Sequence, residues 1–195
     1  MMETDIVYEG DQDGDFLEEL AGTPEGEHLL SCIQCGTCGG TCPVAPALEH
    51  TPRRLIAMIR AGMKEAVLGS LTPWVCASCY DCTVKCPAQV KITELMYSLK
   101  RRGLREGLAP AGADAVAFYG LFTDLVRKYG RAHEMELMTR FMAFRHPIKM
   151  ALQGPMGMQL MMKGRMPLTP HRLRDYAGFS RMVEKALALE KVSAS

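Results

Sequence analysis

The sequence lacks the features that would place the chain in or across a membrane. Its 195 residues include no run of about 18 apolar residues, the length that a bilayer-spanning helix requires. The first 31 residues contain no Lys, Arg or Cys, so they lack the basic start of a secretory signal. We therefore expect a cytoplasmic protein without a membrane span, in which disulfides are not expected.

Positive charge is missing from the start of the chain. Residues 1–31 hold ten Asp and Glu, whereas the remainder holds all 23 Lys and Arg against 12 Asp and Glu, and the whole chain has a net charge of +1. A block of like charge is typical of a solvated, flexible arm, and we assign residues 1–27 to one. The dispersed basic charges of the remainder carry no RNA-type aromatic motif or recognition-helix pattern. We therefore expect a docking surface for an acidic partner, and no nucleic-acid binding.

All eight cysteines of the chain fall in two copies of one motif, C-x2-C-x2-C-x3-C-P, which begin at Cys32 and at Cys76. Three closely spaced thiolates can hold three irons of one 4Fe–4S cubane, and in two-cluster ferredoxins the fourth Cys ligates the other cluster. The motif therefore predicts two 4Fe–4S clusters with crossed ligand sets. The first set is Cys32, Cys35, Cys38 and Cys86, and the second is Cys76, Cys79, Cys82 and Cys42.

Other roles for the cysteines and methionines fit the sequence less well. Zinc sites usually take two spaced pairs of ligands, whereas these cysteines come in overlapping threes with no His between them. A disulfide framework suits small secreted domains. A haem ligand among the 15 Met or 5 His is conceivable, but no C-x-x-C-H sequence accompanies them. Iron–sulfur clusters are the interpretation that accounts for the spacing of all eight cysteines.

Helical spacing dominates the rest of the chain. Thr51 and Pro52 predict the start of a helix between the motifs, and Gly62 and Gly69 predict breaks in it. Thr93 is expected to cap a helix that ends near Gly103. A spacer long enough for two helices indicates an all-α fold, an α-helical ferredoxin domain over residues 28–103, followed by a helical extension over residues 104–195.

The extension contains no Cys but is rich in Met. Apolar residues at 3.6-residue spacing predict helices over residues 115–129, 135–146 and 179–187, with a Gly- and Pro-interrupted stretch between Met150 and Met166. Met fills irregular cores and adaptable interfaces alike, so we expect the extension to dock a partner. The first cysteine loop carries Gly36, Gly39 and Gly40 where the second has bulkier residues, and we expect the two clusters to differ in potential.

The segment from Cys32 to Pro87 resembles the cluster domain of the C subunit of heterodisulfide reductase. It also resembles the iron–sulfur subunits of fumarate reductase and of glycolate- and lactate-oxidising complexes. Fumarate reductase subunits carry an upstream plant-type 2Fe–2S motif, and the glycolate type carries cysteine-rich CCG domains downstream; this sequence has neither. The extension, with Tyr129–Glu134 and Lys163–His171, is similar to that of the C subunit in heterodisulfide reductase-like complexes.

The resemblance implies a non-catalytic electron-transfer subunit of an oxidoreductase complex. It would relay electrons through the two clusters between a flavin-containing partner, similar to the A subunit, and a CCG-domain partner, similar to the B subunit. Two alternatives remain open: a free-standing dicluster ferredoxin, and an iron–sulfur subunit of another flavin-linked dehydrogenase complex. The absence of an obvious three-cysteine site argues against a cluster that itself binds substrate, so no catalytic residue is predicted.

Overall fold

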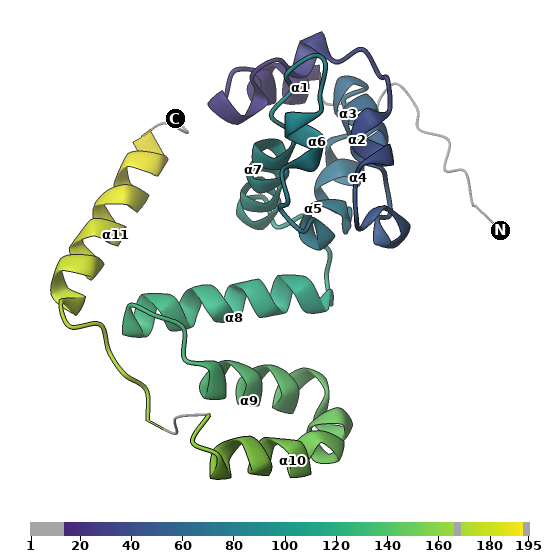
Figure 1. The fold of residues 1–195 in the computed structure, drawn as a ribbon. Helices are drawn as coiled ribbons and strands as arrows, with labels where there is room; N and C mark the ends of the chain where they lie inside the picture. Colours follow the sequence, from purple (N-terminus) through teal and green to yellow (C-terminus); the bar gives the residue numbers. More distant parts are fainter. Residues whose placement is uncertain (1–13, 166–168, 193–195) are drawn as a thin grey trace. The chain divides into compact units, whose positions relative to one another are not determined.

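The computed structural model describes residues 14–165 and 169–192, and every regular element within those ranges is helical, as the all-α prediction requires. The chain divides into two compact units, Met1–Ala113 and Asp114–Ser195. The cysteine motifs lie in the first of these, the N-terminal unit. The helical extension begins within the first unit and makes up the whole of the second, the C-terminal unit (Figure 1).

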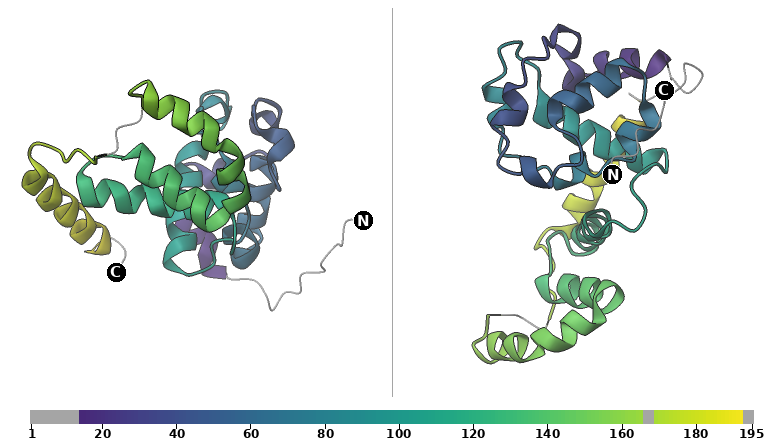
Figure 2. Two further views of the ribbon diagram at one scale, coloured as in Figure 1. Left: turned by 90° about the horizontal axis from the view of Figure 1, so that it is seen from below. Right: turned by 90° about the vertical axis from the view of Figure 1, so that its right-hand side faces the viewer.

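The N-terminal unit is a cluster of short helices that stay grouped in both views of Figure 2. In chain order these are α1 (Gly14–Ala21), η2 (Pro24–Gly26), η3 (Leu29–Ser31), α2 (Thr37–Gly40), η4 (Ala45–Ala47), α3 (Pro52–Arg60), α4 (Lys64–Leu68), α5 (Thr72–Val75), α6 (Asp81–Val84) and α7 (Ile92–Arg105).

Helix α3 begins where the sequence predicts. The Thr51 side chain accepts a hydrogen bond from the Arg54 backbone N–H at 3.3 Å, and Pro52 occupies the first turn, where its missing N–H is not needed. The helix ends at Arg60, and Gly62 then takes the left-handed conformation with φ of 70°. The buried face of α3 packs with α7 in one apolar core. Its fully buried members include Leu55, Ile56, Ile59, Leu68, Ile92, Leu95 and Leu99.

Helix α1 belongs to this core and η2 packs against α1 and α7, a different outcome from the flexible arm expected over residues 1–27. The Phe16 and Leu20 side chains are fully buried in the core cluster. Glu19 pairs with Arg102, Glu25 with Arg101 and Glu27 with Lys91, so the acidic segment is held on the basic side of α7 and its approach. Burial of two large side chains outweighs the solvation of the charges for residues 14–27. Residues 1–13 lie outside the described residues.

The C-terminal unit consists of α8 (Asp114–Tyr129), α9 (Glu134–Arg145), α10 (Pro147–Met162) and α11 (Tyr176–Val192). Helices α8, α9 and α10 pack in chain order, each against the next (Figure 1). Phe118 of α8 meets Phe141 of α9 edge to face with ring centroids 5.4 Å apart, and Leu125 and Leu137 are buried. The start of α11 is tied to the end of α8, because the Tyr176 hydroxyl donates to the Arg127 carbonyl at 2.7 Å.

Candidate metal centre

The two cysteine motifs fold into two loops of the same shape. Gln34 and Ser78, at matching positions between the first and second cysteines, have φ of 58° and 55°. Gly36 and Tyr80, each directly after the second cysteine, have φ of 83° and 65°. Left-handed backbone at residues other than Gly is costly and persists where the surroundings require it. The repeat in sequence is therefore a repeat in backbone conformation, and each loop leads into a four-residue helix, α2 or α6.

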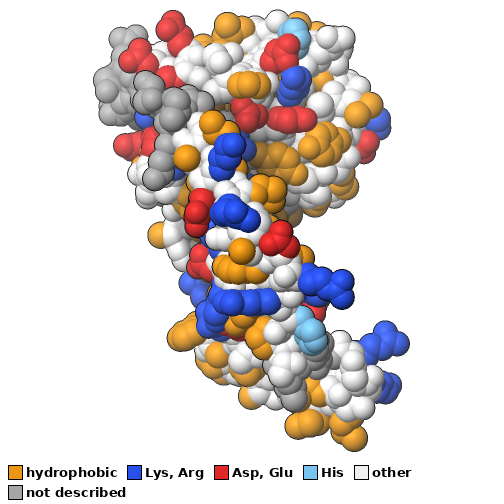
Figure 3. Space-filling model, turned by 90° about the vertical axis from the view of Figure 1, so that its left-hand side faces the viewer, with side chains coloured by type: hydrophobic (Ala, Val, Ile, Leu, Met, Phe, Trp, Pro, Cys, Tyr) orange, Lys and Arg blue, Asp and Glu red, His pale blue; other side chains and the backbone are white. Residues whose placement is uncertain are grey.

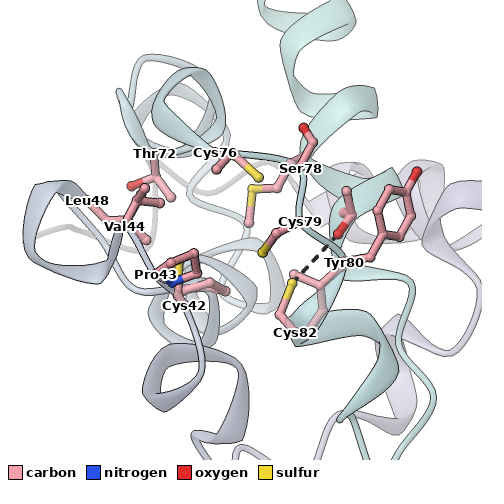
Figure 4. Close-up of a pocket in the computed structure, with 15 residues that line it drawn as sticks. Cys42, Pro43, Val44, Leu48, Thr72, Cys76, Ser78, Cys79, Tyr80 and Cys82 are labelled. Carbon is pink, nitrogen blue, oxygen red and sulfur yellow. Dashed lines mark hydrogen bonds between the residues drawn. The ribbon is translucent and has the colours of Figure 1, made fainter.

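The second loop lines a hollow that we call the Cys76 cavity, of about 420 Å³ including the solvent at its mouth. Its cysteines are Cys76, Cys79 and Cys82 from the second motif and Cys42 from the first. Figure 4 shows the sulfurs of the three second-motif cysteines facing one space, while Cys42 and Pro43 approach it from a separate loop. Three consecutive cysteines of one motif and the last cysteine of the other thus surround the same cavity.

The first loop lines the corresponding Cys32 cavity, of about 330 Å³ measured in the same way. Its cysteines are Cys32, Cys35 and Cys38 from the first motif and Cys86 from the second. Both groupings contain the same residues as the crossed ligand sets that the sequence predicts. The structure brings the sulfurs together around the cavities; which iron each sulfur binds remains a prediction.

The crossing has a simple local cause. After α2 and α6 the chain closes one more tight turn, with the Cys42 N–H donating to the Gly39 carbonyl and the Cys86 N–H donating to the Thr83 carbonyl, both at 3.4 Å. Because α2 and α6 lie against each other, a cysteine that follows one helix reaches the cavity beside the other. The proline after each of these cysteines has no N–H with which to continue the turn.

One core residue is common to both cavities. Ile92, which is only 2% exposed, lines both of them. Val44, Leu48 and Met96 complete the apolar wall of the Cys76 cavity, and Ile56 and Val90 that of the Cys32 cavity. Apolar walls limit the access of water to a cluster, which is one of the means by which a protein sets its potential.

Hydroxyl and amide groups reach several of the sulfurs. In the Cys76 cavity, the Thr93 Oγ1 lies 3.7 Å from the Cys82 sulfur. In the Cys32 cavity, Gln34 donates to the Cys32 sulfur at 3.5 Å and the Thr37 hydroxyl lies 3.4 Å from the Cys35 sulfur. Hydrogen bonds to sulfur are a second determinant of cluster potential. The two cavities therefore receive different hydrogen bonds on different cysteines.

Each cavity runs from the core to the surface, so its thiols differ in exposure and in the direction of their pKa shifts. Burial raises the pKa of the Cys38 thiol to about 11, with the nearby Cys82 as a second cause, and burial also raises the pKa of Cys82. Cys35 and Cys79 are exposed. The hydrogen bond with the Thr37 side chain lowers the pKa of the Cys35 thiol. Because iron binds the thiolate, cluster insertion must displace protons from the Cys38 and Cys82 thiols.

The donor set fits a 4Fe–4S cluster in each cavity. Four thiols per cavity supply one ligand for each iron of a cubane, and soft thiolate ligands are those that such clusters use. In the part of the chain that the structure describes, no three His, Cys, Asp or Glu side chains close around the position of a single ion. The four thiols surround a hollow instead, bounded by apolar side chains.

Two residues of this centre are not identified by the motifs. Ile92 carries no sequence signal for lying between two sites, because its pattern is that of an ordinary core position. Thr93 is visible in the sequence, but the pattern predicts that it caps a helix. That prediction is wrong: α7 begins at Ile92 after Lys91, and the Thr93 hydroxyl contacts Thr83 and Cys82 instead.

Comparison with known proteins identifies the class of the N-terminal unit. Residues 28–90 match the family described as "4Fe-4S dicluster domain". The matched segment contains both cysteine motifs and nearly all of the residues that line the two cavities. The chain therefore carries a dicluster domain for two 4Fe–4S clusters.

The curated relatives narrow the similarity to one kind of dicluster protein. The chain is 33% identical over 110 residues to the C subunit of the H(2):CoB-CoM heterodisulfide,ferredoxin reductase of Methanothermobacter marburgensis, a match that covers 56% of this chain and 59% of that protein. It is 40% identical over 84 residues to the C subunit of the Ferredoxin/F(420)H(2)-dependent CoB-CoM heterodisulfide reductase of Methanosarcina acetivorans, covering 43% and 52%. Over about half of its length the chain is similar to the C subunit of heterodisulfide reductase.

A third relative extends the match slightly. The iron-sulfur C subunit of the CoB--CoM heterodisulfide reductase of Methanopyrus kandleri is 31% identical over 125 residues, which cover 60% of this chain and 65% of that protein. The matched segments thus span from about half to just under two thirds of these relatives. None of the described helices combines the length and the apolarity that crossing a bilayer requires.

Proposed function

We propose that the chain is an electron-transfer subunit of a heterodisulfide reductase-like complex. When bound, two 4Fe–4S clusters supply one-electron carriers, held by Cys32, Cys35, Cys38 and Cys86 in one cavity and by Cys42, Cys76, Cys79 and Cys82 in the other. The observation that carries the proposal is the pair of four-cysteine cavities that share Ile92 while Cys35 and Cys79 reach the surface. An electron can enter at one exposed edge, cross the core and leave at the other.

The partners follow from the resemblance to the C subunit of heterodisulfide reductase. A flavin-containing protein, similar to the A subunit, would deliver or receive electrons at one end. A CCG-domain protein, similar to the B subunit, would perform the disulfide chemistry at the other. The residues of this chain hold the clusters, exclude water with the apolar walls around Ile92, and donate hydrogen bonds to sulfur from Thr93 and Gln34. No catalytic residue is proposed in this chain.

The C-terminal unit supports a role in assembly. Helix α10 has no buried residue, and its exposed side chains include Ile148, Leu152, Met156, Met158 and Met162. Figure 3 shows apolar and basic side chains side by side in the lower part of the view, where α9 and α10 lie. A large exposed apolar surface on a helix is typical of a protein interface. We propose that residues 104–195 dock the partner subunits.

The test is reconstitution under anaerobic conditions. The chain alone should bind about eight Fe and eight sulfide, four of each per cubane. Mixed with its flavin and CCG-type partners, it should be reduced by the first and reoxidised by the second. A chain that exchanges electrons with unrelated acceptors but forms no complex with these partners would instead be a free-standing ferredoxin.

A further inference from the structure

The mouth of the Cys32 cavity is bordered by an exposed apolar side chain and by arginines. Ile33 and Arg53 both line this cavity, and both are exposed, with 68% of Ile33 accessible. The guanidinium of Arg60 donates to the Cys32 carbonyl at 2.9 Å, so Arg60 lies against the same loop. Cys35, an exposed cysteine of the cavity, lies in this rim. We call Ile33, Cys35, Arg53 and Arg60 the Cys32 rim.

The two arginines of the rim share one side of α3. They are seven residues apart, so their positions differ by only about 20° around the helix. Arg54 is displaced from Arg53 by about 100°. Ile56, which lies between the two rim arginines in sequence, also lines the cavity and marks the direction in which this side of the helix faces. Arg53 and Arg60 therefore flank one cluster opening, and Arg54 does not.

No carboxylate of the described residues pairs with these arginines. The ion pairs of the N-terminal unit gather elsewhere: Glu19 and Glu106 pair with Arg102, Glu25 pairs with Arg101, and Glu27 pairs with Lys91. Arg53, Arg54 and Arg60 form no salt bridge within residues 14–165 and 169–192. An apolar side chain and two cations that have no carboxylate partner among the described residues thus border the place where a sulfur of the Cys32 cavity reaches solvent.

We propose that the Cys32 rim is the docking site for an acidic electron-carrying protein. The inference rests on the electron-transfer function proposed above and names the surface and the charge of one partner. Opposite charge steers the partner toward the opening and orients it there. Exposed Ile33 then provides an apolar contact at the centre, and burial of such a side chain adds affinity that salt does not screen. The Cys76 cavity is left for the second partner.

The experiment uses the full chain loaded with both clusters and, as a probe, an acidic 2Fe–2S ferredoxin immobilised on a surface. We expect binding that weakens as salt rises, because exposed charges are screened over about 10 Å at 0.1 M salt. Arg53→Gln and Arg60→Gln should each weaken binding about two- to fivefold at low salt, the range of an exposed ion pair. Arg54→Gln removes the same charge from the same helix and should leave binding within about twofold.

Apolar variants separate the contribution of the apolar contact from that of the charge. Ile33→Ala should weaken binding by a similar factor at low and at high salt. Val84→Ala, which shortens a side chain that is 79% exposed at the end of α6, should not. Iron content and the EPR spectrum are measured for each variant. Arg53, which makes no backbone hydrogen bond of the kind Arg60 makes, keeps the test decisive if Arg60→Gln loses iron.

A transfer measurement links the docking to function. When the ferredoxin is reduced beforehand, it gives up one electron and one cubane of the chain accepts it, so the step balances without a proton. Its rate should fall with Arg53→Gln as the affinity falls, while the midpoint potential of the clusters stays unchanged. A changed potential with unchanged binding would overturn the proposal and show that the arginines act on the cluster itself.

Three further results would overturn it. Equal losses of binding affinity for Arg54→Gln and Arg53→Gln would show that only the net charge of the chain determines binding. Tighter binding of basic cytochrome c than of the ferredoxin would show that the preferred partner is basic and not acidic. Equally tight binding of a single-stranded oligonucleotide, weakened by the same variants, would make the rim a nucleic-acid site. Failure of the proposed electron-transfer function would give a different result from failure of the docking proposal. The unmodified chain would then lack a two-cluster spectrum or pass no electron to its partner subunits.

Discussion

The Thr93 hydroxyl oxygen lies 3.7 Å from the Cys82 sulfur and 3.2 Å from the Thr83 hydroxyl oxygen. The Thr93 backbone N–H in turn donates to the Thr83 oxygen at 3.1 Å. Because Thr83 donates to Thr93, the hydrogen of the Thr93 hydroxyl is left to point at Cys82. Two threonines that are ten residues apart thus form a short chain of hydrogen bonds that ends on a proposed cluster ligand.

The first prediction follows from this contact. A donor to a ligand sulfur favours the reduced, more negative state of a cluster, so Thr93→Val should lower the potential of the cluster in the Cys76 cavity. A hydrogen bond worth about 1 kcal/mol corresponds to roughly 40 mV for a one-electron couple. EPR-monitored titration would measure the shift. Thr93→Ser retains the hydroxyl and should keep the potential of the unmodified chain. An equal shift of the potential in both variants would rule out the hydrogen bond as the cause of the shift.

The second prediction concerns the crossed ligands. Cys86 lines the cavity of Cys38, and Cys42 lines that of Cys82. Cys86→Ser and Cys38→Ser should therefore alter the EPR signal of one cluster, while Cys42→Ser and Cys82→Ser alter the signal of the other. Each single variant should leave the second cluster intact. If Cys86→Ser perturbed the same signal as Cys82→Ser, each motif would hold its own cluster.

The third prediction concerns the N-terminal helix. The Phe16 ring is fully buried and the Arg102 guanidinium lies 5.5 Å from its centroid. Phe16→Ala should destabilise the N-terminal unit by about 3–5 kcal/mol and lower its Tm by on the order of 10–20 °C. Circular dichroism of the iron-loaded protein under anaerobic conditions would measure this. Leu104→Ala, at a side chain that is 56% exposed, is the matched control and should change Tm little.

The fourth prediction concerns the C-terminal unit. The N-terminal unit has its own apolar core and contains all eight cysteines, so a chain ending at residue 113 should still bind close to its full complement of iron. It should co-purify with the flavin and CCG-type partners much less than the full chain does, because the exposed apolar surface of α10 is lost while the Cys32 rim remains. An iron assay and a pull-down of the same preparation measure both properties. Retained complex formation would mean that the N-terminal unit alone carries the docking surfaces.

The sequence predicts the kind and number of the clusters, because the information for them is local. The doubled cysteine motif indicates the number and kind of clusters, and the confirmed start of α3 depends on two adjacent residues, Thr51 and Pro52. Chemical identity and spacing over a few residues determine both features. Where a contact joins distant segments, as Ile92 joins the two cavities, the sequence carries no comparable signal.

Glycine and proline show where local rules fail. The sequence predicts a helix end near Gly103, yet α7 continues to Arg105. A side chain at residue 103 would meet the Leu68 carbonyl oxygen at 3.3 Å, so glycine permits the close approach of α4. Likewise, the sequence predicts an interrupted stretch from Met150, but α10 runs from Pro147 to Met162 with Pro155 inside it. Residues 166–168, where that stretch ends, lie outside the described residues.

The acidic start of the chain shows a competition between two effects. The charge block favours solvation, whereas Phe16 and Leu20 favour burial, and only three-dimensional packing reveals which effect is larger for residues 14–27. A sequence pattern that is dominated by charge can therefore conceal a short helix that belongs to the core.

The single side chain of Ile92 also bears on how electrons are shared. It lies at the start of α7 in the close-packed core, so core packing, and not a loop or a hinge, sets the spacing of the two cavities. Tunnelling between the occupants would occur through a fixed barrier of constant thickness. The rate of electron transfer between the two clusters would then be constant. Regulation of the overall rate would occur at the docking surfaces, where partners bind and dissociate.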